Sequence, residues 1–320
     1  LSLMKRKFIV GALAALFAFV QVQAYELVKP DMTLKLYPKG QGVDLGIVEN
    51  GQAITLGPIE PNGLSGANTV NDRGNVGNIG DDAYIDIYIP KKCNGQMIVV
   101  CPGGGYSNCS AANEGSRVAD WCTKRGIAVC VVLYRMPNGH CKLPLRDVQN
   151  AFRYCRHHAS EWGVKQIGVM GFSAGGHLAA SASTLFVDDV TRPDFSVLIY
   201  PVITFEELTH GGTRLNLIGP KPSRRDVTYY SLENQVSANT PETILLLSAD
   251  DGAVNPENSI NYYRAMQRCG VPGELHIFTS GGHGWGFTTV ENSGRDGLGD
   301  QRADFFQILG RWLDNRRQSL

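Results

Sequence analysis

The segment IGVMGFSAGGHLAAS (residues 167–181) decides the fold, because an apolar run passes through Gly171-Phe172-Ser173-Ala174-Gly175 into a helix-length stretch. Residues 167–170 have the pattern of a buried strand, and the residues from His177 onward have the pattern of a helix. The spacing Gly-x-Ser-x-Gly between them is typical of a sharp strand-to-helix turn that lifts the serine hydroxyl above the sheet edge. Glycine is needed there because a side chain two positions from the serine would collide with neighbouring backbone. We therefore take Ser173 as a candidate nucleophile.

Strand-like and helix-like stretches alternate along the rest of the chain. The strand candidates are residues 84–89, 97–101, 127–133, 167–170, 195–199, 244–248 and 274–278. The helical patterns lie at residues 114–125, 145–160, 175–186, 256–269 and 303–314. This alternation predicts an α/β fold with a mostly parallel central sheet flanked by helices. We expect one domain over residues 25–320, after a loop-rich segment at 31–82.

One insertion interrupts this alternation of strands and helices. Residues 203–240 contain Gly211-Gly212, Pro220 and Pro222 and have no clean periodicity. In an open α/β sheet, such a segment lies where loops cover the carboxyl ends of the strands. We expect a lid-like insertion or a pocket wall.

The first 24 residues have the features of a secretory signal peptide. Lys5-Arg6-Lys7 precedes the apolar run Phe8–Val20, and Val22-Gln23-Ala24 supplies a small-residue cleavage site. The apolar run is shorter than the roughly 20 residues that span a bilayer. We expect export to the periplasm or the extracellular space, with no membrane attachment after cleavage behind Ala24.

Charge and cysteine content limit the partners. The chain has 30 basic and 30 acidic residues, so no net field attracts it to nucleic acid or an anionic membrane, and we expect a neutral substrate. Disulfides are possible in an oxidising compartment, but Cys101 and Cys130 lie in strand-like runs that favour buried thiols. No Cys/His spacing resembles a zinc site. The oligomeric state stays open.

A serine nucleophile needs a base and an orienting carboxylate, and in this type of fold they follow in the order serine, acid, histidine. Asp250 and Asp251 directly follow the strand at 244–248. His283 follows the strand at 274–278 and is flanked by glycines. Of the seven histidines, only His283 has such a position, and we assign it as the base. We favour Asp251 as the acid and keep Asp250 as the alternative.

The tetrahedral intermediate of acyl transfer also needs hydrogen-bond donors for its oxyanion. The loop Cys101-Pro102-Gly103-Gly104-Gly105-Tyr106 follows a strand and resembles the glycine-rich loops that offer backbone N–H groups in lipases and esterases. We assign one donor to Gly104 or Gly105 and the second to the N–H of Ala174. Tyr106 and Trp285 flank these loops and are candidates for the substrate pocket, with packing as the equal alternative.

With these residues assembled, the sequence resembles the esterase branch of the α/β-hydrolase superfamily, and bacterial acetylxylan esterases in particular. The similar segments are CPGGGY (101–106), WGVKQIGVMGFSAGGHLAAS (162–181), RPDFSVLIYPVI (192–203), SADDGAVNPENS (248–259) and GVPGELHIFTSGGHGWG (270–286). The resemblance implies the triad Ser173, Asp251 and His283. It also implies hydrolysis of acetyl esters on plant cell-wall polysaccharide without metal or cofactor, so the expected partner is an acetylated polysaccharide or oligosaccharide.

Three other interpretations remain open. A feruloyl esterase would share the fold and differ in the loops that set the size of the acyl pocket. A prolyl-oligopeptidase-like serine peptidase would share the order of the triad, but such enzymes carry a large gating domain, and only about 60 residues separate the signal from the first predicted strand. A sugar-binding module without catalysis would be expected to lack a member of the triad.

Overall fold

The computed structural model describes residues 27–37, 43–49, 52–56, 61–80 and 83–317. The expected signal peptide, residues 1–24, lies outside the described residues. Within them, no helix is long and apolar enough to cross a membrane.

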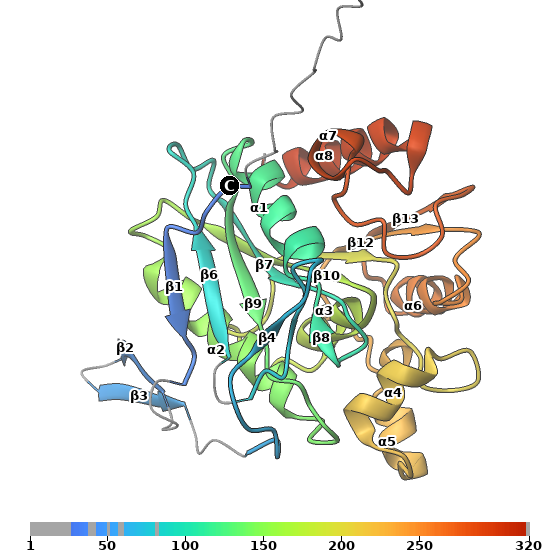
Figure 1. Ribbon diagram of the computed structural model, residues 1–320, viewed down its shortest axis with the longest axis horizontal. Helices are drawn as coiled ribbons and strands as arrows, with labels where there is room; N and C mark the ends of the chain where they lie inside the picture. Colours follow the sequence, from blue (N-terminus) through green and yellow to red (C-terminus); the bar gives the residue numbers. More distant parts are fainter. Residues whose placement is uncertain (1–26, 38–42, 50–51, 57–60, 81–82, 318–320) are drawn as a thin grey trace, which may run out of the picture.

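A central sheet of eight strands organises the chain (Figure 1). Its spatial order is β1 (Met32–Lys35), β6 (Tyr84–Tyr88), β9 (Ala128–Leu133), β7 (Gln96–Cys101), β10 (Gln166–Phe172), β11 (Ser196–Ile199), β12 (Thr243–Ser248) and β13 (Gly273–Phe278). The strands from β9 to β13 pair in parallel, whereas β6 is antiparallel to both β1 and β9. The carboxyl ends of the parallel strands therefore meet at one edge of the sheet.

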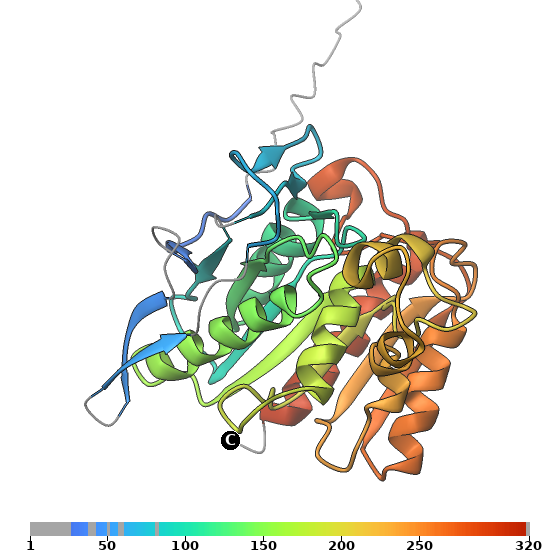
Figure 2. The same ribbon diagram turned by 90° about the horizontal axis from the view of Figure 1, so that it is seen from below.

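Helices cover both faces of this sheet. Figure 2 shows α2 (Leu143–His158), α3 (Ser173–Thr184) and α6 (Glu257–Arg268) on the near face. On the opposite face, α1 (Arg117–Thr123) meets α8 (Arg302–Arg317), where the rings of Trp121 and Phe306 stack. The mostly parallel α/β sheet predicted from the sequence is confirmed.

The apolar pattern explains why these segments take these positions. Helix α2 buries Val148, Ala151, Phe152 and Cys155, a spacing that places all four on one helical stripe facing the core. Strands β7, β9 and β12 are buried at every position, as expected for strands covered on both faces.

The seven predicted strands and five predicted helices all occur, with ends shifted by a few residues. The helical stretch expected from residue 114 opens instead with a π-helical turn, η2 (Ala112–Ser116), before α1. The structure also contains strands that the sequence did not reveal, most of them in the loop-rich segment. These are β1, the hairpin of β2 (Val43–Glu49) and β3 (Gln52–Leu56), and the small sheet of β4 (Thr69–Val70), β5 (Val76–Gly77) and β8 (Asn108–Cys109).

The insertion at residues 203–240 folds into α4 (Gly211–Ile218), α5 (Arg224–Tyr229) and the 3-10 turn η3 (Leu232–Asn234). The Asn258 side chain on α6 accepts the N–H groups of Ile203 and Thr204 and so anchors the start of the insertion. The Asn216 amide on α4 donates to the carbonyl oxygen of Gly105 at 2.8 Å. The insertion thus contacts the glycine-rich loop at residues 101–106, which we call the glycine loop. The action of the insertion as a lid stays a prediction.

All eight cysteines lie among the described residues and are free thiols. Cys101 and Cys130 are completely buried in neighbouring strands. Burial raises the pKa of both thiols, which keeps them protonated.

Candidate active site

Ser173 lies on a strained turn between β10 and α3. Its φ is 54°, in the left-handed region, although it is not a glycine. A Cβ at Gly171 would lie 2.1 Å from the carbonyl oxygen of Gly175, and a Cβ at Gly175 would lie 2.1 Å from that of Cys101. The two glycines are therefore required sterically, as the sequence pattern predicts.

The structure brings the three predicted triad side chains together. The Nε2 atom of His283 lies 2.8 Å from the Oγ of Ser173, and its Nδ1 lies 2.7 Å from the Oδ2 of Asp251. A carboxylate can only accept at Nδ1, so that nitrogen carries the ring proton and Nε2 is free to accept from the serine hydroxyl. This arrangement provides a general base next to a hydroxyl nucleophile.

Asp251 is held as a carboxylate. Its side chain is only 1% exposed, and burial alone would favour the neutral acid. Hydrogen bonds from His283 and from the N–H groups of Val254 and Ala253 outweigh burial and hold the pKa of Asp251 below its usual range. The negative charge is therefore present to stabilise a protonated His283.

Asp250, the alternative acid, has a different position. Its carboxylate accepts the N–H groups of Gly281 at 3.3 Å and Gly282 at 2.8 Å. These bonds fasten the loop that carries His283 to the end of β12. Of the two adjacent aspartates, the structure places Asp251 against the imidazole.

The glycine loop after β7 lies directly against the nucleophile. A Cβ at Gly103 would lie 2.9 Å from the Cβ of Ser173, so this loop reaches the serine only with glycine there. The N–H of Gly103 donates to Glu114 at 2.7 Å, which leaves Gly104 and Gly105 as the loop's candidate oxyanion donors. The N–H of Ala174 lies in the first turn of α3, where backbone donors have no partner within the helix.

A buried carboxylate that the sequence did not reveal connects these loops. Glu114 accepts the N–H of Gly103 and the hydroxyl of Tyr200, both at 2.7 Å. The Tyr200 hydroxyl in turn accepts the N–H of Gly286 at 2.8 Å, and its ring packs on the ring of His283. Through these hydrogen bonds, Glu114 connects the glycine loop to the loop that carries His283 and Gly286, which we call the histidine loop. In the sequence it is one acidic residue in a helix-like stretch, and nothing marks it as buried.

The two aromatic residues expected near the substrate, Tyr106 and Trp285, are almost completely buried. Tyr106 is 2% exposed, and its hydroxyl lies 3.0 Å from Nδ1 of His177. Trp285 is also 2% exposed and donates to the Oγ of Ser248 at 3.0 Å. The Tyr106 hydroxyl and the Trp285 ring nitrogen thus both form hydrogen bonds with buried side chains. Trp285 borders a cavity beside His283, and Tyr106 borders a smaller one beside Asn216, although both side chains are almost completely buried.

His177, behind the nucleophile on α3, is buried and uncharged. Its Nε2 donates to the carbonyl oxygen of Tyr230 at 2.9 Å, so its Nδ1 accepts from the Tyr106 hydroxyl. Burial lowers the pKa of His177 to about 4. This histidine packs beneath the site, and its ring nitrogens bond to partners other than Ser173.

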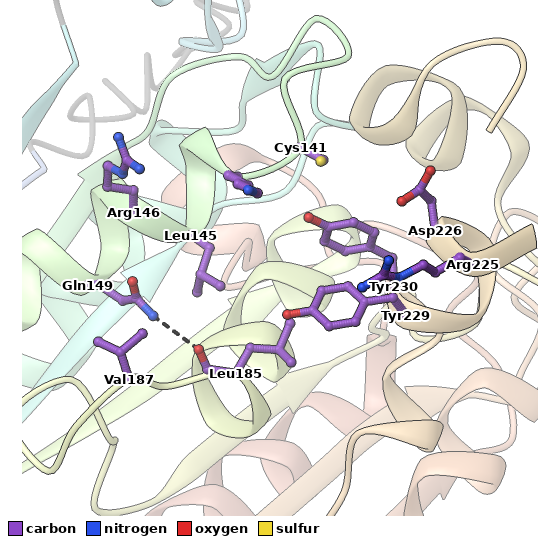
Figure 3. Close-up of a pocket in the computed structure, with 11 residues that line it drawn as sticks. Cys141, Leu145, Arg146, Gln149, Leu185, Val187, Arg225, Asp226, Tyr229 and Tyr230 are labelled. Atoms are coloured by element: carbon purple, nitrogen blue, oxygen red, sulfur yellow. Dashed lines mark hydrogen bonds between the residues drawn. The ribbon is translucent and has the colours of Figure 1, made fainter. Parts of the chain in front are cut away.

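A cavity of about 280 Å³ is lined by residues that include Tyr106, Ser107 and Asn216. Two larger cavities lie near the other elements of the site. One, of about 660 Å³, opens beside His283 and is lined mainly by polar residues. The other, of about 470 Å³, lies where α2 and α5 face each other, with Tyr229, Tyr230 and Leu145 in its wall (Figure 3). The triad side chains line only the first of these two, through His283. Among the described residues, no group of three or more His, Cys, Asp or Glu could hold a metal ion.

Comparisons with known proteins identify relatives of this chain. Residues 85–196 match the family model described as BD-FAE. The chain is 40% identical over 246 residues to an acetylxylan esterase of Xylanibacter ruminicola, a match that covers 74% of this chain and 49% of that protein. It is 35% identical over 203 residues to endo-1,4-beta-xylanase B of Butyrivibrio fibrisolvens, covering 58% and 32%. The chain thus spans about half or less of the length of these curated relatives.

A solved structure also matches. The acetyl ester-xyloside bifunctional hydrolase of Caldicellulosiruptor lactoaceticus is 36% identical with a TM-score of 0.63, covering 72% of this chain and 89% of that one. With such identity over nearly the whole of that relative, the chain belongs to the α/β-hydrolase esterases.

Proposed function

We propose that this protein is a serine carboxylesterase that removes acetyl groups from xylan. The observation that carries the proposal is the pair of hydrogen bonds running from Ser173 through His283 to the buried Asp251, at 2.8 and 2.7 Å. The glycine loop in contact with Ser173 adds to it, because acyl transfer needs oxyanion donors beside the nucleophile.

In the proposed mechanism, Nε2 of His283 takes the Ser173 proton as Oγ attacks the acetyl carbonyl carbon. The N–H groups of Ala174 and of Gly104 or Gly105 hold the resulting oxyanion. His283 then gives its proton to the departing sugar hydroxyl, and an acetyl-serine remains. Water, deprotonated by His283, attacks this ester and releases acetate. Asp251 keeps the imidazole in the required tautomer and stabilises its charged form.

The names of the relatives support xylan as the substrate, since one is an acetylxylan esterase, one a xylanase, and one an acetyl ester-xyloside hydrolase. We further propose that residues 1–24 direct export, since a polymeric substrate does not enter the cell. The contact of Asn216 with Gly105 supports a role for residues 203–240 in covering the site.

The test is an assay of wild type beside Ser173→Ala. Acetate release from acetylated xylan and phenol release from a short aryl acetate are followed, with a feruloyl ester and a prolyl anilide as controls. We expect wild type to cleave the acetyl esters, and the alanine variant to lose at least about a thousandfold. Turnover of only the feruloyl ester or only the anilide would contradict the proposed substrate. Equal rates for both proteins would contradict the proposed nucleophile.

A further inference from the structure

The cavity beside His283 is built from segments that are distant in the sequence. Its lining includes Arg73, Asn75, Ser110, Arg117, His283 and Arg295. They come from the β4–β5 hairpin, the loop after β8, the start of α1, the loop that carries His283, and the loop after α7 (Val290–Ser293). With about 660 Å³, the cavity has room for more than an acetyl group.

The lining has more basic than acidic side chains, although the net charge of the whole chain is zero. Three arginines line the cavity, and Asp72 is its one acidic lining residue. Within the part of the chain that the structure describes, Arg73 and Arg295 form no ion pair, and both are exposed to the cavity's solvent. The nearby Asp296 does not neutralise them, because it is paired with the buried Arg302 at 2.8 Å.

The backbone beneath both exposed arginines is fixed. The Asn71 side chain accepts the N–H groups of Arg73 and Asn75 and closes the turn of the β4–β5 hairpin, and β5 pairs with β8 next to the glycine loop. On the other side, the Ser293 hydroxyl donates to the carbonyl oxygen of Arg295. The two cationic side chains therefore extend from ordered supports near the site.

The position of His283 shows which part of a substrate would enter this cavity. In the proposed mechanism His283 protonates the leaving oxygen, so that oxygen must lie within hydrogen-bond reach of Nε2. The alcohol half of the ester, here a sugar, therefore leaves on the side of His283. The cavity that opens beside His283 is then the place for the sugar and its neighbours in the polymer.

We propose that Arg73 and Arg295 bind a carboxylate on the sugar portion of the substrate, so that the preferred substrate is an acetylated polysaccharide bearing uronic acid residues. This inference rests on the proposed function and adds a recognition site to it. A guanidinium group matches a carboxylate in charge and in geometry, whereas a neutral sugar offers it no opposite charge. The cavity also supplies polar side chains, such as Asn75 and Ser110, for sugar hydroxyls.

The test compares two acetylated xylo-oligosaccharides of the same length, one neutral and one with a glucuronic acid substituent next to the acetylated residue. The proteins are wild type, Arg73→Gln, Arg295→Gln, the double variant, and Arg264→Gln as control. Arg264 lies on α6 outside this cavity and pairs with the exposed Glu257. A short aryl acetate, which carries no sugar, reports the basal chemistry of each protein.

We expect wild type to prefer the acidic substrate in kcat/KM by about three- to tenfold at low salt, and the preference to shrink at about 0.5 M salt. The double variant should lose the preference and keep its aryl acetate activity, and Arg264→Gln should behave as wild type. Equal wild-type rates on the two oligosaccharides, or a preference that survives the double substitution, would overturn the inference. Absence of aryl acetate hydrolysis in wild type would instead overturn the proposed function.

Discussion

Replacing Asp251 by asparagine should nearly abolish catalysis while leaving the fold intact. The Oδ1 atom of Asp251 accepts two backbone N–H groups, from Ala253 and Val254, both at 2.9 Å. In the Asp251→Asn variant, the oxygen of the new side-chain amide has to stay at that position. Turning the NH2 group there would orphan two donors, each at a cost of about 1–3 kcal/mol. The NH2 group must therefore face Nδ1 of His283.

An NH2 group can only donate, so it selects the tautomer of His283 in which Nδ1 accepts and Nε2 carries the proton. Nε2 would then face the Ser173 hydroxyl as a donor and could not take its proton. Loss of the correct tautomer is expected to lower kcat by about 10⁴, which corresponds to about 5 kcal/mol of activation free energy. Release of phenol from a short aryl acetate measures this effect, and circular dichroism verifies the fold.

The matched control is Asp250→Asn. The Asp250 carboxylate accepts the N–H groups of Gly281 and Gly282, and one amide oxygen can retain the shorter of these bonds. We expect kcat to stay within about tenfold of wild type, because the imidazole keeps its partner. A near-normal rate for Asp251→Asn together with a large loss for Asp250→Asn would refute the assignment of the acid.

Three supports of the site can be tested separately. Glu114→Gln leaves either the Gly103 N–H or the Tyr200 hydroxyl without its acceptor. We therefore expect the unfolding free energy to fall by about 2 kcal/mol and kcat to fall by about 10- to 100-fold. Urea denaturation measures the first effect and aryl acetate kinetics the second, and an unchanged kcat would contradict the role of Glu114 in connecting the two loops. The pKa of His177 falls from 6.5 when unfolded to about 4 when folded, so its contribution to stability is present above pH 6.5 and is lost as the pH falls towards 4, about 3 kcal/mol in all. Urea unfolding between about pH 7 and pH 4.5 should therefore show a shallower loss for His177→Gln than for wild type, and parallel curves would exclude this source. Gly175→Ala places a methyl group 2.1 Å from the Cys101 carbonyl oxygen and should lower the unfolding free energy by about 3 kcal/mol or more. Gly310→Ala, which adds a methyl group in open space on α8, should raise the unfolding free energy slightly. Thermal unfolding compares the two variants, and equal melting temperatures would contradict the steric argument.

The sheet and the triad residues were predictable because their signals are local. A parallel strand buried on both faces is a short apolar run, and β7, β9 and β12 each show one. The serine turn requires glycines two positions to each side, and the acid and base must follow strands that end at the same edge. Each of these constraints acts over a few residues, so each leaves a readable pattern.

What escaped prediction depends on contacts between distant segments. Strand β1 has four residues with alternating half-buried and exposed positions, and it is a strand only because β6 pairs with it. Glu114 and Tyr200 are 86 positions apart, and neither has a neighbour in the sequence that indicates their hydrogen bond. The choice between stacking and packing for Trp285 stayed open for the same reason, since its partner Ser248 lies 37 positions away.

The proposed function depends above all on Ser173 being the activated nucleophile of an ester hydrolase. The most direct measurement is labelling with an organophosphorus reagent that reacts with activated serines, followed by mass spectrometry of the digested protein. We predict one label, on the peptide that contains Ser173, and a loss of aryl acetate hydrolysis in proportion to the fraction labelled. A label on another serine, or full hydrolytic activity in a protein labelled at Ser173, would contradict this assignment.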